Sequence, residues 1–477
     1  MKKILKIIIA QLLTLFIFLV IIAIAGQIYT FLRPGYKVLD VIPDRDIGWR
    51  LVPNATFTYT GGHWYENEFK TQIKVNSLGF RDKERTVEKH KKLIRMVVIR
   101  DSSVAAHEVS FEKTPAQLLE VYLNGANPGE FTQKTKYEVL NFGVGGFGLG
   151  QNFLTNRAYV KDFFPDYVFL FIFEGNIWRT VSPMSAVTNK MPQDKMLSVR
   201  PTVQVSENQL KSLLEVLNFK EFHQFLLDQK LNDPNLVGID HFSEEEYAGF
   251  IEKQRSLITR KKIISISQRL MGMTLLVYPA RDFDKFVSLQ NETIISEFNG
   301  QRTRIREQRL FILELGGKLL SGFKVLRRKF QPELKMQDEV EKLLKIYSPR
   351  KSNSLFDGSQ DFPNLEKTIF INLKTIEVMN SDVESYGGNL VIVDATSNRI
   401  QKGRLPANLL STILEKFCDV NDIGYIPLYQ DLNAANLNGE KTRWLYDGHM
   451  NELGYKIFAE SMYHWLQENG HANLTDN

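Results

Sequence analysis

The sequence predicts an α/β fold, a doubly wound and mostly parallel sheet in three layers, with a mainly helical insertion and an N-terminal transmembrane helix. Three observations predict it. Apolar runs of strand length alternate with helical stretches over residues 93–180, and the same alternation returns over residues 386–477. The residues between, 181–385, have helical rather than strand periodicity. An uncharged apolar run stands at the N-terminus.

The apolar run extends from Ile7 to Leu32 and is long enough to cross a bilayer as a helix. Three lysines precede it and a large polar region follows, which predicts a cytoplasmic N-terminus for a single-pass protein of a bacterial cell membrane. Residues 1–32 would form this anchor, and the main domain would be periplasmic or extracellular. The alternative is a signal peptide cleaved after Ala25. Apolar residues continue past Ala25, which favours an uncleaved anchor.

A polar, turn-rich segment, residues 33–92, follows the anchor and is expected to pack on the α/β domain. The first part of that domain, residues 93–180, opens with the continuous apolar run "LIRMVVI", typical of a central strand covered on both faces. In the helical stretch at 114–124, Pro115 lies in the first turn. The backbone N–H that proline lacks would have no partner within the helix at this position. The expected strands are 93–99, 137–143 and 165–173, and the expected helices are 114–124 and 149–163.

The insertion, residues 181–385, contains long amphipathic helical segments and one candidate strand at 273–280. Its stretch 305–330 mixes apolar and basic residues, which suits a helix packed inside the insertion or one lying at a membrane surface. The second part of the α/β domain is residues 386–477. It is expected to contain strands at 387–395 and 424–432, a helix at 406–421 and a C-terminal helix.

The composition argues against several classes of protein and of site. The net charge of +5 is small for 477 residues, and no basic-aromatic pattern typical of a nucleic-acid module is present. A single cysteine, Cys418, excludes an internal disulfide and a cysteine-based zinc site, so no metal or cofactor is expected. Residues 254–351 carry roughly twice as many basic as acidic residues. They could form a solvated helical face, or a surface for an anionic glycan, phospholipid or envelope protein complex.

The candidate site combines residues with the roles that acyl transfer requires. Ser102 follows the first strand and is the candidate nucleophile. His449 is the candidate base, and Asp447, two residues earlier, can orient it. Donors for an oxyanion are the backbone N–H of Ser102, the backbone N–H of Gly146 and the side-chain amide of Asn176. All lie where strands end, and active sites of such sheets occur at that edge.

Four segments carry a resemblance to the SGNH or GDSL hydrolase-like superfamily, specifically to its bacterial membrane-anchored members. They are "VVIRDSS" with Ser102, "NFGVGGFG" with Gly146, "PDYVFLFIFEGN" with Asn176, and "DGHMNELGY" with Asp447 and His449. The resemblance covers about residues 43–180 and 387–465. It implies a flavodoxin-like three-layer domain and a Ser-His-Asp triad, with these five residues in the roles given above.

The sequence departs from the family pattern at two modulating positions. Arg100 replaces the glycine before Asp101-Ser102, and Ile177 replaces the acid after Asn176. Arg100 could pair with Asp101, clamp an anionic substrate or block the acyl group. Ile177 removes a carboxylate that would help to position the site.

These features predict a cell-envelope ester hydrolase or O-acyltransferase that acts without a cofactor. The resemblance and the external location favour an acetyl ester on a glycan, or another envelope ester. Two alternatives remain: a catalytically impaired protein that binds a glycan or partner through the same fold, and an assembly protein that recruits an envelope complex through residues 254–351.

Overall fold

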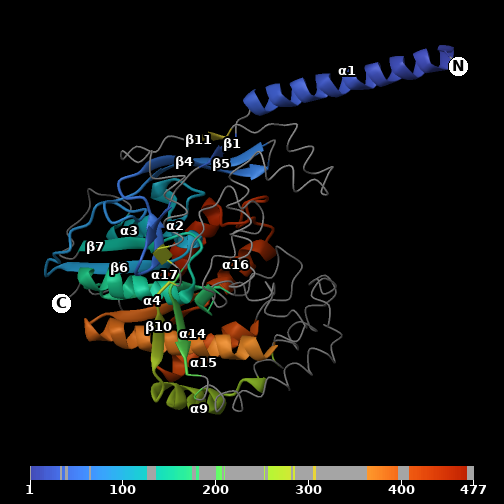
Figure 1. Cartoon of the computed structure of the whole chain (residues 1–477). Coiled ribbons are helices and arrows are strands. Elements are labelled where there is room, and N and C mark those ends of the chain that lie inside the picture. The colour runs from blue at the N-terminus through green and yellow to red at the C-terminus, as the bar shows by residue number, and fades with distance from the viewer. Residues whose placement is uncertain are drawn as a thin grey trace.

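The computed structural model shows an α/β protein built on one five-stranded, all-parallel sheet, which agrees with the α/β part of the predicted fold class (Figure 1). The residues that it describes are 2–32, 35–37, 41–63, 66–125, 136–173, 179–181, 200–206, 209, 252, 256–280, 283–284, 305–307, 362–395 and 408–469.

The strands of the sheet lie in the order β13-β12-β8-β6-β7. Read from the β7 edge, the order in the chain is second, first, third, fourth, fifth, which is that of doubly wound sheets of the flavodoxin type. β6 pairs with both β7 and β8, so the direction of winding reverses beside β6, and ligands bind at such a reversal. The bounds are β6 Leu93–Arg100, β7 Lys136–Gly143, β8 Tyr167–Ile172, β12 Asn389–Asp394 and β13 Gly424–Ile426.

Helices cover both faces of this sheet because its strands are apolar on both faces. Val97 and Ile99 of β6 belong to one buried cluster, whereas Met96 and Val98 belong to the other. In Figure 1, α14 and α15 lie on one side of β6 and β7, and α3 lies on the other. On the first face are α4 (Leu149–Ala158), α14 (Phe362–Ser385), α15 (Asn408–Val420) and α9 (Arg260–Met271), and on the second are α2 (Ser102–Ala105), α3 (Pro115–Asn124), α16 (Leu428–Leu437) and α17 (Glu452–Glu468).

One expected strand is too long. Residues 424–432 were expected to be extended, but β13 ends at Ile426 and α16 begins at Leu428. The residue between them is Pro427, which has no N–H for the strand ladder and stands at the N-cap of the helix.

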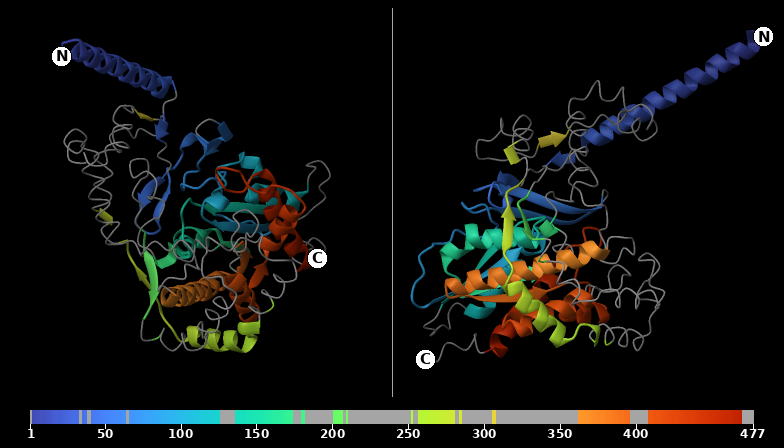
Figure 2. Two further views of the ribbon diagram at one scale, coloured as in Figure 1. Left: turned by 90° about the vertical axis from the view of Figure 1, so that its right-hand side faces the viewer. Right: turned by 60° about the horizontal axis from the view of Figure 1, so that its bottom comes forward.

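The predicted insertion, residues 181–385, is described only in part. Its expected strand at 273–280 is present as β10 (Leu275–Tyr278), which pairs antiparallel with β9 (Thr202–Val205). Figure 2 shows α9 on the far side of α15 from the sheet. α14 packs directly on the sheet, with Phe370 and Ile376 fully buried in the same cluster as β6. Most of the basic region 254–351 lies outside the described residues.

The segment before the domain folds into two antiparallel hairpins. They are β2 (Val41–Asp44) with β3 (Gly48–Leu51), and β4 (Thr56–His63) with β5 (Glu66–Lys74). Ile47, Trp49 and Phe80 are buried in the core of the α/β domain. These three residues pack this segment against the α/β domain.

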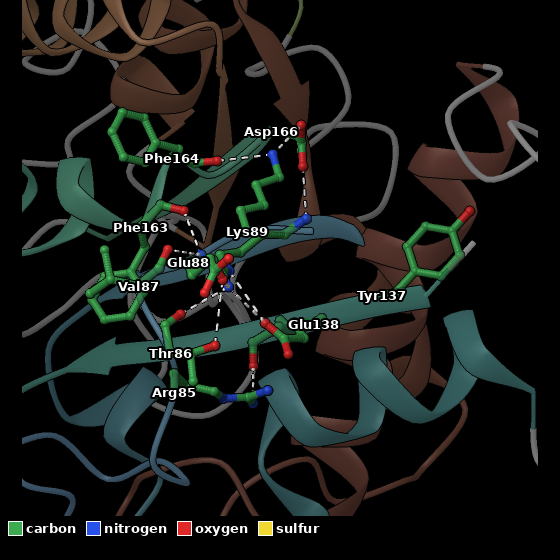
Figure 3. Close-up of polar contacts among 12 residues, drawn as sticks. Arg85, Thr86, Val87, Glu88, Lys89, Tyr137, Glu138, Phe163, Phe164 and Asp166 are labelled. Atoms are coloured by element: carbon green, nitrogen blue, oxygen red, sulfur yellow. Dashed lines mark hydrogen bonds and ion pairs between the residues drawn. The ribbon is translucent and has the colours of Figure 1, made fainter. Parts of the chain in front are cut away.

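Polar contacts fix the end of that segment at the amino-terminal edge of the sheet. Lys89 donates to the carbonyl of Phe164 at 3.0 Å and to the carboxylate of Asp166 at 2.7 Å. Figure 3 draws both contacts. Arg95 of β6 is fully buried, and its guanidinium donates to the backbone carbonyl of Val87 at 3.0 Å.

α1 spans Lys2–Leu32 and lies apart from the sheet and its helices in Figures 1 and 2. Its side chains are described without interruption over residues 9–25. Over the described residues, no helix combines the length and the apolar character required to traverse a bilayer.

Candidate active site

Ser102 lies at the carboxyl edge of the sheet, where β6 passes directly into the short helix α2. Asp101 is the N-cap of α2, and its side chain accepts a hydrogen bond from the backbone N–H of Ser103 at 3.0 Å. Ser102 is therefore the first residue of the helix, and its side chain is half-buried rather than enclosed. This location agrees with that of a nucleophile on a strand-to-helix turn.

The "NFG" of residues 141–143 holds α2 against the end of β7. A Cβ on Gly143 would lie 2.3 Å from the backbone nitrogen of Ala105, so only glycine allows α2 to approach this closely. The Asn141 amide donates to the carbonyl of Val104 at 2.8 Å and accepts from the Gly143 N–H at 2.8 Å. These contacts explain the asparagine and the first glycine of the segment.

The structure brings Ser102 together with His449 and Asp447. The His449 Nε2 atom lies 2.9 Å from the Ser102 Oγ atom, although 347 positions separate them in the chain. On the other side of the ring, Nδ1 is hydrogen-bonded to the Asp447 carboxylate. The loop is held from β5, because the Glu68 carboxylate accepts from the Tyr446 N–H at 3.0 Å and the Asp447 N–H at 2.9 Å.

Carboxylates dominate the electrostatics of His449. Burial of the ring lowers its pKa, but the carboxylates of Glu108, Asp447 and Asp101 more than offset this effect and raise the pKa to about 9. For Asp447, an acid, burial has the opposite effect and raises the pKa. Its hydrogen bonds to His449 outweigh burial and hold the pKa of Asp447 below the ordinary value. His449 therefore favours the protonated form and Asp447 the ionised form.

Sequence reasoning missed Glu108, the second carboxylate at His449. Its Oε1 atom lies 3.4 Å from His449 Nδ1, and the residue is only 2% exposed. Tyr455 donates its hydroxyl to Glu108 Oε2 at 2.9 Å. Burial raises the pKa of Glu108 despite the nearby His449. Spacing gave no signal for Glu108, because Tyr455 and His449 reach it from distant parts of the chain.

Among the described residues, Glu108, Asp447 and His449 form a group that could hold a cation. One potential ligand atom from each lies within 4.8 Å of the others. Both ring nitrogens of His449 already make hydrogen bonds, to Ser102 and Asp447. The arrangement thus corresponds to that of a serine, a base and its orienting acid.

The loop that carries Gly146 follows β7 at the same edge, where the Val144 N–H donates to the Arg100 carbonyl at 3.0 Å. Gly146 has a φ of 81°, a left-handed conformation that favours glycine. The neighbouring Gly145 carbonyl accepts from the Trp49 indole N–H at 2.9 Å, and the Gly146 carbonyl accepts from Arg200 at 3.3 Å. The predicted amide donor Asn176 and the modulator Ile177 lie outside the described residues.

Arg100 pairs with Asp101, which is one of the three roles considered for it. Its Nε atom lies 2.9 Å from the Asp101 carboxylate, and Arg179 binds the other oxygen at 2.7 Å. The guanidinium is buried between the rings of Phe171 and Phe173, with its carbon 3.9 Å and 4.2 Å from their centres. Burial lowers the pKa of Arg100 to about 9, although Asp101 opposes the effect. In this position Arg100 supports the cap of α2.

A cavity of about 680 Å³ has Glu108 in its wall, but Ser102, Asp447 and His449 are not among its lining residues. It lies between β5, the loop at residues 108–112 and Trp444, and its walls include Phe69, Phe111 and Glu112.

No family model matches the chain. A search of the curated proteins likewise finds no significant match.

Proposed function

We propose that the protein is a serine ester hydrolase or O-acyltransferase of the SGNH type. The observation that carries the proposal is the chain of contacts from Ser102 Oγ through His449 to Asp447, with 2.9 Å between the serine oxygen and the histidine nitrogen. This is the geometry that an activated serine nucleophile requires. The location beside β6, at the reversal of the sheet, supports the proposal further.

In the proposed reaction, the Ser102 oxygen forms a bond to the ester carbonyl carbon while its proton moves to His449 Nε2. The carbonyl oxygen becomes an oxyanion, for which the N–H groups of Ser102 and Gly146 and the amide of Asn176 are the proposed donors. The alkoxide then leaves with the proton from His449, and an acyl-serine remains. Water completes hydrolysis, or an alcohol of an acceptor takes the acyl group.

Two measurements test the proposal on the full-length chain. Acetate or p-nitrophenol released from short acyl esters measures turnover, and mass spectrometry locates the adduct of a serine-reactive phosphonate. We expect turnover and a single adduct on Ser102. If neither turnover nor a Ser102 adduct is found between pH 7 and pH 10, the protein is not a serine esterase.

The raised pKa of His449 predicts alkaline activity. The base must be neutral to accept the Ser102 proton, and with a pKa of about 9 only about one molecule in a hundred is neutral at pH 7. We expect kcat/KM to rise about tenfold per pH unit below pH 8 and to level off above about pH 9. Hydrolysis rates measured across this range with a non-titrating ester check the prediction. A plateau that begins below pH 7 would contradict it.

We further propose that α1 holds the protein at a bacterial membrane, with the α/β domain outside and envelope acyl esters, such as acetylated glycans, as substrates. Leu12 and Phe16 of α1 are 60% and 62% exposed, so these apolar side chains lack a protein environment. Residues 9–25 are only part of the uncharged run Ile7–Leu32. Removal of residues 1–32 is expected to transfer the protein from the membrane pellet to the supernatant after carbonate extraction. An intact chain that carbonate releases would contradict membrane insertion.

A further inference from the structure

Two carboxylates, rather than one, approach the same nitrogen of His449. Nδ1 is hydrogen-bonded to Asp447, and Glu108 Oε1 lies 3.4 Å from that nitrogen. The side chain of Glu108 is 1% exposed and that of Asp447 is 16% exposed. A charge as buried as Glu108 is costly to maintain unless neighbouring groups compensate it, so its location requires a physical reason.

The surroundings hold Glu108 in place. The Tyr455 hydroxyl, from α17, donates to Oε2 at 2.9 Å. The backbone around Glu108 is fixed by Arg81, which is fully buried and donates to the carbonyls of Ala105 at 3.1 Å and Val109 at 2.7 Å. The orientation of Glu108 toward His449 is therefore set by two separate parts of the chain.

The charges that face His449 are mainly negative. Asp447 comes from the same loop, Glu108 from the loop after α2, and Asp101 from the cap of α2. The cation Arg81 acts on Glu108, and the neighbouring His107 is buried with a pKa lowered to about 3 by that burial, so it remains neutral. A positive charge on His449 is thus stabilised from three directions.

We propose that Glu108 is a second acid for His449, a positioning residue that orients the ring with Asp447 and stabilises the imidazolium formed when Ser102 gives up its proton. The inference rests on the proposed function. The physical reason is that a buried carboxylate interacts more strongly with a charge that develops beside it than a solvated one does. This role beside His449 also explains why Glu108 is buried.

The test measures the His449 ring directly in the full-length chain. Histidine labelled with ¹³C at Cε1 is incorporated, and the pH titration of each ring is followed by NMR in detergent, with His449→Gln identifying the resonance. In Glu108→Gln, which preserves size and hydrogen-bonding capacity, we expect the pKa of His449 to fall by about one to three pH units. The acid limb of kcat/KM is expected to move to lower pH by the same amount.

Two further variants make the result specific. Glu112→Gln is the matched control, because Glu112 is an exposed glutamate of the same region. It should leave the His449 titration unchanged. Tyr455→Phe removes only the hydroxyl that stabilises the ionised form of Glu108, and should lower the pKa of His449 by a smaller amount. This variant also provides the test if Glu108→Gln does not fold.

The outcomes separate the inference from the proposed function. A His449 titration that neither Glu108→Gln nor Tyr455→Phe displaces overturns the role of Glu108. An active Glu108→Gln enzyme whose acid limb is that of the wild type overturns it as well, and leaves the esterase standing. If the wild type shows no turnover and no Ser102 adduct, the proposed function fails, and the catalytic role of Glu108 fails with it.

Discussion

Replacement of Ser102 by alanine is expected to lower kcat for ester hydrolysis by about 10³-fold or more, and to abolish phosphonate labelling. The reason is that Ser102 Oγ is the only atom at this position able to form the acyl bond, and His449 Nε2 at 2.9 Å would then have no proton to accept. Turnover of short acyl esters and mass spectrometry of the adduct measure the effect.

The neighbouring Ser103→Ala is the matched control for this experiment. Ser103 contributes its backbone N–H to the Asp101 cap, and alanine retains that donor. It should keep nearly all activity, and both variants should unfold at the wild-type temperature. A Ser102→Ala variant that hydrolyses esters at the wild-type rate would show that another group performs the reaction.

Replacement of Arg100 by methionine is expected to lower the free energy of unfolding by about 3 kcal/mol. Methionine can still fill much of the space between Phe171 and Phe173, but it removes the cation at 2.9 Å from the buried Asp101 carboxylate. Asp101 would then depend more heavily on Arg179, whose side chain is 24% exposed. Urea unfolding followed by tryptophan fluorescence measures the change.

Arg157→Met provides the control because it removes the same chemistry at the surface. Arg157 pairs with Asp382 at 2.6 Å and lies over the ring of Phe153 at 4.3 Å, but its side chain is 46% exposed. Loss of this pair should lower the free energy of unfolding by about 1 kcal/mol or less, since solvent screens an exposed ion pair. Equal decreases in the free energy of unfolding for both variants would show that burial of Arg100 contributes nothing to stability.

Most strands of the central sheet could be predicted because each contains an apolar run of strand length. "LIRMVVI" forms most of β6, the run at 137–143 forms all of β7 except Lys136, and the run at 165–173 contains β8. The error at residues 424–432 also has a local cause, since Pro427 ends β13 and is followed by a helix. Where one residue sets the backbone locally, the sequence is informative.

The candidate triad was predictable for a different reason. Ser102 follows a strand, and Asp447 and His449 stand two positions apart, so each piece had a local pattern. No local pattern indicated how closely Ser102 and His449 approach each other. Glu68, Trp49 and Arg81 all hold the loops of the site from the preceding segment, but nothing in their spacing indicates this.

By itself, the sequence determined most strands of the central sheet, the order in which they occur in the chain and the residue types available for acyl transfer, because these depend on periodicity and local chemistry. Only the tertiary structure decided that Arg100 is buried against Asp101 and that Glu108 lies beside His449. Both results depend on desolvation and on contacts between distant segments: the rings of β8 and its C-terminal flank enclose Arg100, and Tyr455 of α17 fixes Glu108. Burial of a charge is a property of the packed fold, so no local pattern in the chain reveals it.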